Sequence, residues 1–225
     1  LMNAMQKELR LDRQPRHIEC FDNSNLQGSH PVASCVVFRD GKPSRKEYRH
    51  FNIKTVEGPD DYASMREVVF RRYTRLMAEG AELPDLIIAD GGKGQMGVIH
   101  EVLERLGLDI PIAGLAKDDR HRTAELLCGF PPLLVGIRPT SPLFHFLSQI
   151  QEEVHRFAIA FHRQKRSKAF IHSELEQIEG IGDKTVQTLL RHFRTVEKVR
   201  AANIEELSAL VGPAKAKKIK AFFEK

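Results

Sequence analysis

The chain has 225 residues, of which 41% are hydrophobic and 29% charged, and its formal net charge is +5. It has no run of about 18 apolar residues and no signal-peptide pattern at its start, so we expect neither a membrane span nor a membrane partner. Cys20, Cys35 and Cys128 lack paired spacing, which excludes a disulfide framework and an all-cysteine zinc site. We expect a cytoplasmic protein whose positive charge suits a polyanionic partner, and the missing initiator methionine indicates a piece of a longer chain.

The first part of the chain predicts an antiparallel meander. Residues 1–15 are polar and are expected to be a leader or linker from an upstream region, either frayed or the end of a helix. Short apolar runs then predict strands at 17–22, 31–39 and 47–53. Asp40-Gly41 is a hairpin signal between the second and third of these.

A helix and strand alternation follows, which is typical of a parallel α/β layer. Asp60 or Asp61 is expected to cap the first helix, and Gly107 to end the second. The run Leu86-Ile87-Ile88-Ala89 is apolar on both faces, so its strand belongs in the middle of a covered sheet. In chain order we expect a helix at 62–79, a strand at 84–90, a helix at 93–106, strands at 110–116, 122–127 and 133–135, and a helix at 141–168.

The last quarter of the chain is purely helical in composition. Residues 169–173 are expected to be a linker with a flexible hinge, and a domain boundary is placed near residue 170. Two glycine-containing turns, Gly180-Ile181-Gly182 and Val211-Gly212-Pro213, recur at a spacing near 31 residues, each between two short helices. We expect domains at 16–168 and 174–225.

Two aspartates end neighbouring strands in this topology. The first strand becomes central and lies beside the strand that follows the first helix, so Asp22 and Asp90 are expected to lie a few ångströms apart. Two carboxylates at one place repel unless a cation lies between them, and Mg²⁺ or Mn²⁺ is the natural cation for such oxygen ligands. Each aspartate alone is equally consistent with a turn residue or a helix cap.

A third ligand is expected from the long helix before the boundary. His155 is the best candidate, with Glu152 and Glu153 as alternatives, and Asp61 could supply a further carboxylate. A histidine on an amphipathic helix is otherwise an ordinary surface or core residue. Lys93, after Gly91-Gly92, could contact a phosphate, although a solvated lysine explains it equally.

The glycine turns of the last quarter predict DNA binding. They free backbone N–H groups at a helix start, and such groups bind phosphates without reading sequence. The glycines are Gly180, Gly182 and Gly212, and Lys184 and Lys215 follow them to add charge. A plain helical turn would explain one copy, whereas two copies in a basic segment favour DNA.

Several motifs together resemble the C-terminal half of UvrC, the incision nuclease of bacterial nucleotide excision repair. They are Glu19-Cys20-Phe21-Asp22, Gly58-Pro59-Asp60-Asp61-Tyr62, Ala89-Asp90-Gly91-Gly92-Lys93-Gly94-Gln95, Gly114-Leu115-Ala116-Lys117, and His155-Arg156-Phe157-Ala158 with His162-Arg163. They occur in order from about residue 15 to the end. One departure is Asn25, where the family commonly has histidine, so any role of that histidine is in doubt here.

The resemblance implies a fold, a reaction and partners. The fold is an α/β RNase H-like mixed sheet flanked by helices, followed by a small all-α tandem helix-hairpin-helix domain. The reaction is the incision on the 5′ side of a lesion, with an Asp-Asp-His triad on Asp22, Asp90 and His155 and a further acidic residue at Asp61. The partners are damaged duplex DNA and UvrB loaded on it, while the segment that docks on UvrB lies in the other half of the family's chain.

The hypothesis is therefore a DNA endonuclease that uses Mg²⁺ or Mn²⁺. Lys93, Arg156, Arg163 and Lys165 are expected to hold the DNA backbone by charge. One alternative is a non-catalytic RNase H-like module that only binds or docks on DNA. Another is a nuclease that acts on the RNA of hybrids, against which the tandem hairpins favour duplex DNA.

Overall fold

The computed structural model describes residues 1–24, 31–117 and 123–224. These form two compact units, Leu1–Ile159 and Ala160–Lys225, each with its own hydrophobic core. Within the described ranges, no helix is both long and apolar enough to cross a membrane. Asn25 and residue 122 of the expected strand at 122–127 lie outside these ranges.

The first unit is built on one mixed sheet, which has eight strands in the described ranges. The order is β3-β2-β1-β5-β6-β7-β8, with β4 also paired to β2. β1 is antiparallel to β2 and parallel to β5, and β5 is parallel to β6. The strands are β1 (His17–Ser24), β2 (Val32–Arg39), β3 (Lys42–Pro43), β4 (Arg49–Asn52), β5 (Leu86–Ala89), β6 (Ile112–Lys117), β7 (Thr123–Cys128) and β8 (Leu133–Val135).

The hydrophobic and turn residues of the sequence explain how these strands are placed in the sheet. All four residues of β5 are fully buried, as an apolar run between two helical layers should be. The Asp40-Gly41 turn joins β2 to β3, and Gly41 adopts the positive φ of 78° that a two-residue hairpin demands. After the short 3₁₀ turn η1 (Arg45–Glu47), β4 returns to pair with β2, which confirms the meander.

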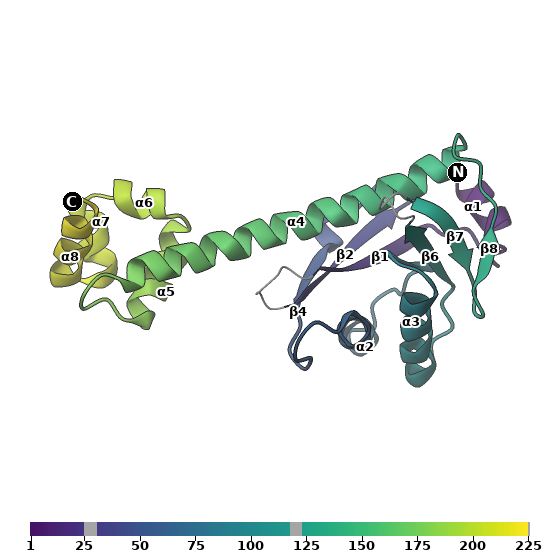
Figure 1. Ribbon diagram of the computed structural model, residues 1–225, viewed down its shortest axis with the longest axis horizontal. Coiled ribbons are helices and arrows are strands. Elements are labelled where there is room, and N and C mark those ends of the chain that lie inside the picture. The colour runs from purple at the N-terminus through teal and green to yellow at the C-terminus, as the bar shows by residue number, and fades with distance from the viewer. Residues whose placement is uncertain (25–30, 118–122, 225) are drawn as a thin grey trace. The chain divides into compact units, whose positions relative to one another are not determined.

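Helices cover the two faces of the sheet. Figure 1 shows α2 (Asp61–Ala78) and α3 (Lys93–Leu106) on one face and the first part of α4 (Pro142–Glu176) on the other. The Asp60 side chain caps α2 by accepting a hydrogen bond from the Ala63 backbone N–H at 3.0 Å. Gly107 ends α3 in the left-handed conformation. Both ends agree with the sequence expectation.

The first residues of the chain form a helix, which agrees with the second of the two structures expected for them. They form α1 (Met2–Glu8), beside β7 and β8 in Figure 1. Met5 is 0% exposed and Leu9 only 3%, and both belong to the core of the first unit. Their spacing of four residues places them on one helix face, which a mostly polar composition concealed.

The long helix is also longer than expected. α4 was expected to end at Lys168 before a linker at 169–173, but it continues to Glu176. The segment contains neither glycine nor proline to end a helix, and Ile171 and Leu175 repeat the helical spacing. Both side chains are buried in the core of the second unit, so the expected hinge is helical instead.

The second unit adds four short helices to the end of α4. Thr195 and Asn203 cap two of them by accepting hydrogen bonds from the backbone N–H groups of Lys198 and Glu206. Apolar side chains from every helix form its core. The helices are α5 (Asp183–Phe193), α6 (Val196–Ala201), α7 (Ile204–Val211) and α8 (Pro213–Phe223).

Candidate metal centre

The two aspartates lie side by side at one edge of the sheet. Phe21 of β1 pairs with Ala89 of β5, so Asp22 and Asp90 are the next residues on two parallel neighbouring strands. The Asp90 backbone N–H donates to the Phe21 carbonyl oxygen at 3.0 Å, which extends the ladder to this point. The Asp90 side chain is 0% exposed and that of Asp22 is 13% exposed.

His155 reaches the same point from α4. Its Nε2 atom is in hydrogen-bond contact with Oδ2 of Asp90 and lies 3.7 Å from Oδ2 of Asp22. One possible ligand atom from each of the three residues lies within 4.8 Å of the others. The side chain of His155 is 36% exposed, so the group is open to a substrate on the helix side.

Lys117 is a fourth member of this group, and the sequence reasoning assigned it no role. Its Nζ donates to Asp90 Oδ2 at 3.1 Å and lies 3.1 Å from His155 Nε2. Lys117 ends β6, the neighbour of β5, so its position follows from the same strand order that joins Asp22 to Asp90. A lysine at the end of a strand is usually exposed to solvent, so its residue type gave no reason to assign it to the site.

Gln151 is a fifth member that the sequence reasoning missed. Its Nε2 donates to Oδ1 of Asp90 at 2.7 Å, and only 7% of the residue is exposed. It precedes His155 by four residues on α4, and this spacing was the signal that could have revealed it. The Asp90 carboxylate therefore has a partner on each oxygen.

The electrostatics of the group reflect its two crowded carboxylates. Burial, followed by the charge of Asp90, raises the pKa of Asp22 to about 7. Burial alone would raise the pKa of Asp90, but hydrogen bonds from His155 and Gln151 hold it below its usual value. The hydrogen bond to Asp90 raises the pKa of His155 above its usual value.

These residues fit a hard divalent cation. Two carboxylates and one imidazole supply oxygen and nitrogen donors of the kind that Mg²⁺ and Mn²⁺ accept. The raised pKa of Asp22 shows that its negative charge is poorly compensated by the protein alone. A cation between the two carboxylates would relieve this repulsion.

The other acidic candidates lie outside this group. The Asp61 carboxylate is not among the ligand atoms that converge in the described part of the chain, although its backbone carbonyl accepts a hydrogen bond from Asn23 at 2.7 Å. Glu153 accepts hydrogen bonds from Tyr48 and from Arg156, so it is committed elsewhere. Glu152 is exposed, and its carboxylate is not among the ligand atoms that converge in the described part of the chain.

The cations expected to contact DNA differ in their exposure and in the side-chain contacts that they already make. Lys93 is exposed at the start of α3, three residues after Asp90, and Arg163 is exposed on α4. Arg156 is exposed but forms a two-point ion pair with Glu153. The Lys165 Nζ lies 5.1 Å from the ring centre of Phe161, over its face.

The glycine turns of the second unit have the expected backbone. Gly180 and Gly212 take positive φ values of 83° and 91°, and Gly182 is the N-cap of α5. Lys184 is exposed just beyond the first turn. Lys215 follows the second turn, but its Nζ donates to Thr185 Oγ1 at 2.9 Å and so links the two motifs.

A glycine also shapes the loop beside Asp90. A Cβ on Gly94 would overlap the hydroxyl oxygen of Tyr62, whose residue is 53% exposed. The bare backbone of Gly94 therefore lets Tyr62 lie over the start of α3. This joins two of the motifs that the sequence singled out separately.

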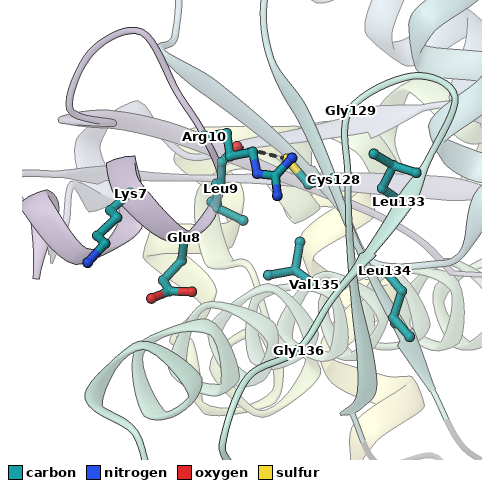
Figure 2. A pocket seen from close by; sticks show the side chains of 10 residues that line it. All are labelled: Lys7, Glu8, Leu9, Arg10, Cys128, Gly129, Leu133, Leu134, Val135 and Gly136. Carbon is teal, nitrogen blue, oxygen red and sulfur yellow. Dashed lines mark hydrogen bonds between the residues drawn. The ribbon is translucent and has the colours of Figure 1, made fainter.

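A cavity near the start of the chain lies apart from the candidate metal centre. A cavity of about 550 Å³ lies between the end of α1 and the turn before β8, and Figure 2 shows Lys7, Arg10 and Cys128 on its wall. Burial raises the pKa of the Cys128 thiol, whose Sγ donates to the Leu9 carbonyl oxygen at 3.3 Å. No residue of the candidate metal centre lines it.

Two family descriptions match the chain, one on each part. "UvrC RNAse H endonuclease domain" matches residues 6–159, and "SAM-like Helix-hairpin-helix tandem" matches residues 173–225. The first match covers well over half of the chain and contains all five residues of the site.

The chain belongs to the UvrC family. The resemblance drawn from the motifs is thus confirmed, and so are the RNase H-like mixed sheet and the tandem helix-hairpin-helix fold.

Named relatives are similar over almost the whole chain. "UvrABC system protein C" of Bacteroides fragilis is 61% identical over 220 residues, which are 98% of this chain and 36% of the relative. The protein of the same name from Flavobacterium johnsoniae is 52% identical over 226 residues, or 100% of this chain and 37% of the relative. The chain thus spans little more than a third of the length of these UvrC relatives.

Solved structures show only remote likeness. A Ciona intestinalis Endonuclease V bound to inosine-containing DNA has a TM-score of 0.36 and 16% identity, over 52% of this chain and 57% of that one. A Clostridium butyricum Argonaute has a TM-score of 0.32 and 11% identity, over 56% and 17%. Likeness of this degree carries no inference about the UvrC chain.

Proposed function

We propose that this UvrC chain is a divalent-metal-dependent DNA endonuclease that makes the 5′-side incision in nucleotide excision repair. The observation that carries the proposal is the convergence of Asp22, Asp90 and His155 in a UvrC-type endonuclease domain. The substrate would be damaged duplex DNA already held by UvrB, in the bacterial cytoplasm. The segment that docks on UvrB would belong to the part of the relatives that this chain does not span.

Each residue of the centre has a separate task in this proposal. Asp22, Asp90 and His155 would hold Mg²⁺ or Mn²⁺, which when bound supplies Lewis acidity to the scissile phosphate and the attacking water. Water would attack in line, and the 3′-oxygen would leave. Lys117, already in contact with Asp90, would add positive charge where the phosphate gains negative charge.

The exposed cations would position the DNA around this centre. Lys93 and Arg163 are exposed and can reach phosphates by charge alone, whereas Arg156 would first have to leave Glu153. Asp61 is better supported as a residue that shapes the edge of the site than as a direct ligand, because its carboxylate lies outside the converging set. In the second unit, Gly180, Gly182, Gly212, Lys184 and Lys215 would bind duplex phosphates without reading sequence.

The test is nicking of supercoiled plasmid by the purified chain in Mn²⁺ or Mg²⁺. We expect Asp22→Asn, Asp90→Ala and His155→Ala each to lower the nicking rate by at least about 100-fold, because each removes a ligand. Glu152→Gln is the matched control, since it removes an exposed carboxylate from the same helix as His155. Removal of the metal by a chelator should stop nicking by the unmodified chain.

The outcomes separate the alternatives. Nicking that survives Asp22→Asn and Asp90→Ala would sink the proposed centre. Duplex binding without nicking in any metal, when UvrB–DNA complexes are also supplied, would favour the non-catalytic docking module. Preferential cleavage of the RNA strand in a hybrid would instead favour an RNA-directed nuclease.

A further inference from the structure

The Asp90 carboxylate is held from two sides by a single helix. Gln151 donates to its Oδ1 at 2.7 Å, while His155 contacts its Oδ2. Both residues belong to α4 and are four positions apart, so they lie on one face of the helix, one turn from each other. α4 therefore contacts this carboxylate through two side chains, one on each oxygen.

The contact between Gln151 and Asp90 is held rigidly because both side chains are buried. Asp90 is 0% exposed and Gln151 is 7% exposed. Ile150 and Val154, the residues just before Gln151 and His155, are both 0% exposed in the core of the first unit. A shift of α4 that moved the amide away from Oδ1 would have to repack these side chains.

The two oxygens of Asp90 are thereby made different. The amide N–H uses Oδ1, whereas Oδ2 is the oxygen that faces His155 and Lys117. We infer that Gln151 is a positioning residue: it holds the Asp90 carboxylate so that Oδ2 alone is presented to the cation. This inference rests on the proposed metal centre and adds to it the mode of binding, which is through one carboxylate oxygen.

The inference predicts which cation the centre prefers. Mg²⁺ and Mn²⁺ favour octahedral shells with single-oxygen carboxylate ligands, whereas Ca²⁺ readily accepts both oxygens of one carboxylate. A carboxylate freed from Gln151 could turn and offer both oxygens. Loss of the amide should therefore weaken Mn²⁺ more than Ca²⁺.

The experiment is a titration of the whole 225-residue chain with Mn²⁺, followed by the electron paramagnetic resonance signal of free Mn²⁺, with Ca²⁺ as competitor. We expect Gln151→Met, which keeps the bulk but not the donor, to lower Mn²⁺ affinity about tenfold and Ca²⁺ affinity clearly less. Gln151→Asn keeps the amide but is one methylene short, so it should act in the same direction even if the methionine variant folds poorly. Gln149→Met is the matched control, an exposed glutamine on the same helix.

The results distinguish this inference from the proposed centre. If Gln151→Met and Gln151→Asn keep the wild-type affinities, or if Mn²⁺ and Ca²⁺ affinities fall equally with the melting temperature, Gln151 is only a packing residue and the inference is wrong. If Asp22→Asn leaves Mn²⁺ binding unchanged, the metal centre itself is wrong. A selective loss of Mn²⁺ in both Gln151 variants, with Asp22→Asn also deficient, supports both.

Discussion

Glu19, three residues before Asp22 on β1, is a buried acid that takes no direct part in the metal centre. It is 1% exposed and accepts hydrogen bonds from Nε and Nη2 of Arg72 at 2.6 Å each, from the Tyr73 hydroxyl at 2.9 Å and from the His17 ring at 3.0 Å. Burial alone would raise the pKa of Glu19, but the hydrogen bonds from Arg72 and His17 lower it to about 2. The ion pair joins the central strand to α2, and so it supports the strand that carries Asp22.

This depressed pKa predicts how acid affects stability. Because the pKa of Glu19 falls from 4.5 to about 2 on folding, its carboxylate stabilises the fold above pH 4.5 and loses that effect as the pH falls toward 2. The loss amounts to about 3 kcal/mol at roughly 1.4 kcal/mol per pKa unit. Glu19→Gln should flatten this part of the profile, measured by urea unfolding at about pH 5 and about pH 3.

The control for this prediction is a change of a similar but exposed acid. Glu79→Gln removes a carboxylate that pairs with Arg75 at the surface of α2 and should leave the slope as in the wild type. Glu19→Gln will also lower stability at neutral pH, because Arg72 then loses its buried partner. The slope with pH, and not the level, is therefore decisive, and an unchanged slope in Glu19→Gln would contradict the assignment.

Sequence reasoning placed part of the site and missed the rest for physical reasons. Asp22 and Asp90 could be brought together because strand order alone decides which strand ends are neighbours. Strand order brings the backbone of Lys117 near Asp90, and the four-residue spacing to His155 does the same for Gln151, but whether their long side chains reach Asp90 depends on rotamers that the sequence does not specify. Asp61 stays a prediction, since its carboxylate is not among the three ligand atoms that converge in the described part of the chain.

At the scale of elements, helices with clear ends were predicted best. The expected helix at 93–106 coincides with α3, because Gly92 and Gly107 mark both of its ends. α4 was cut short because the change of composition near Ser173 was interpreted as following a linker at 169–173, while the buried spacing of Ile171 and Leu175 continued the helix. Composition was thus a weaker guide than periodicity.

The first helix offers a direct test of this point. Met5 is fully buried, so Met5→Ala should lower the free energy of unfolding by about 2 to 4 kcal/mol through the lost contacts and the cavity left behind. Glu8→Ala, on the same helix but exposed, should change it by less than about 0.5 kcal/mol. Chemical denaturation measures both, and equal stabilities of the two variants would mean that α1 is a loose leader after all.

At the scale of the whole molecule, what the net charge of +5 implies for DNA binding depends on which cations are engaged by neighbouring side chains and which are exposed. Some are neutralised locally, as Arg156 is by Glu153, and Lys215 is engaged by Thr185. Others, such as Lys184 beside the first glycine turn, are exposed. Binding to duplex DNA should depend on these exposed cations.

Salt dependence tests this expectation. Lys184→Ala should weaken duplex binding to all sequences alike and reduce the slope of log affinity against log salt by about one, since one phosphate contact is lost. Lys198→Ala removes the same charge from an exposed position on α6, away from both glycine turns, and should leave the slope nearly unchanged. Fluorescence anisotropy over a salt series measures both variants, and equal slopes would mean that the turn does not bind phosphate.

The hydrogen bonds to both oxygens of Asp90 have a practical consequence for trapping the proposed nuclease on its substrate. An asparagine at position 90 has one oxygen and one amide group, whereas Gln151 and Lys117 place an N–H donor against each side of the carboxylate. The amide N–H group of the asparagine would then face the N–H donor of Gln151 or of Lys117, and this repulsion would distort the site. The Asp22 side chain is 13% exposed and lies 3.7 Å from His155 Nε2, so an amide there can turn toward solvent, and Asp22→Asn is the better inactive variant for crystallising an intact DNA complex.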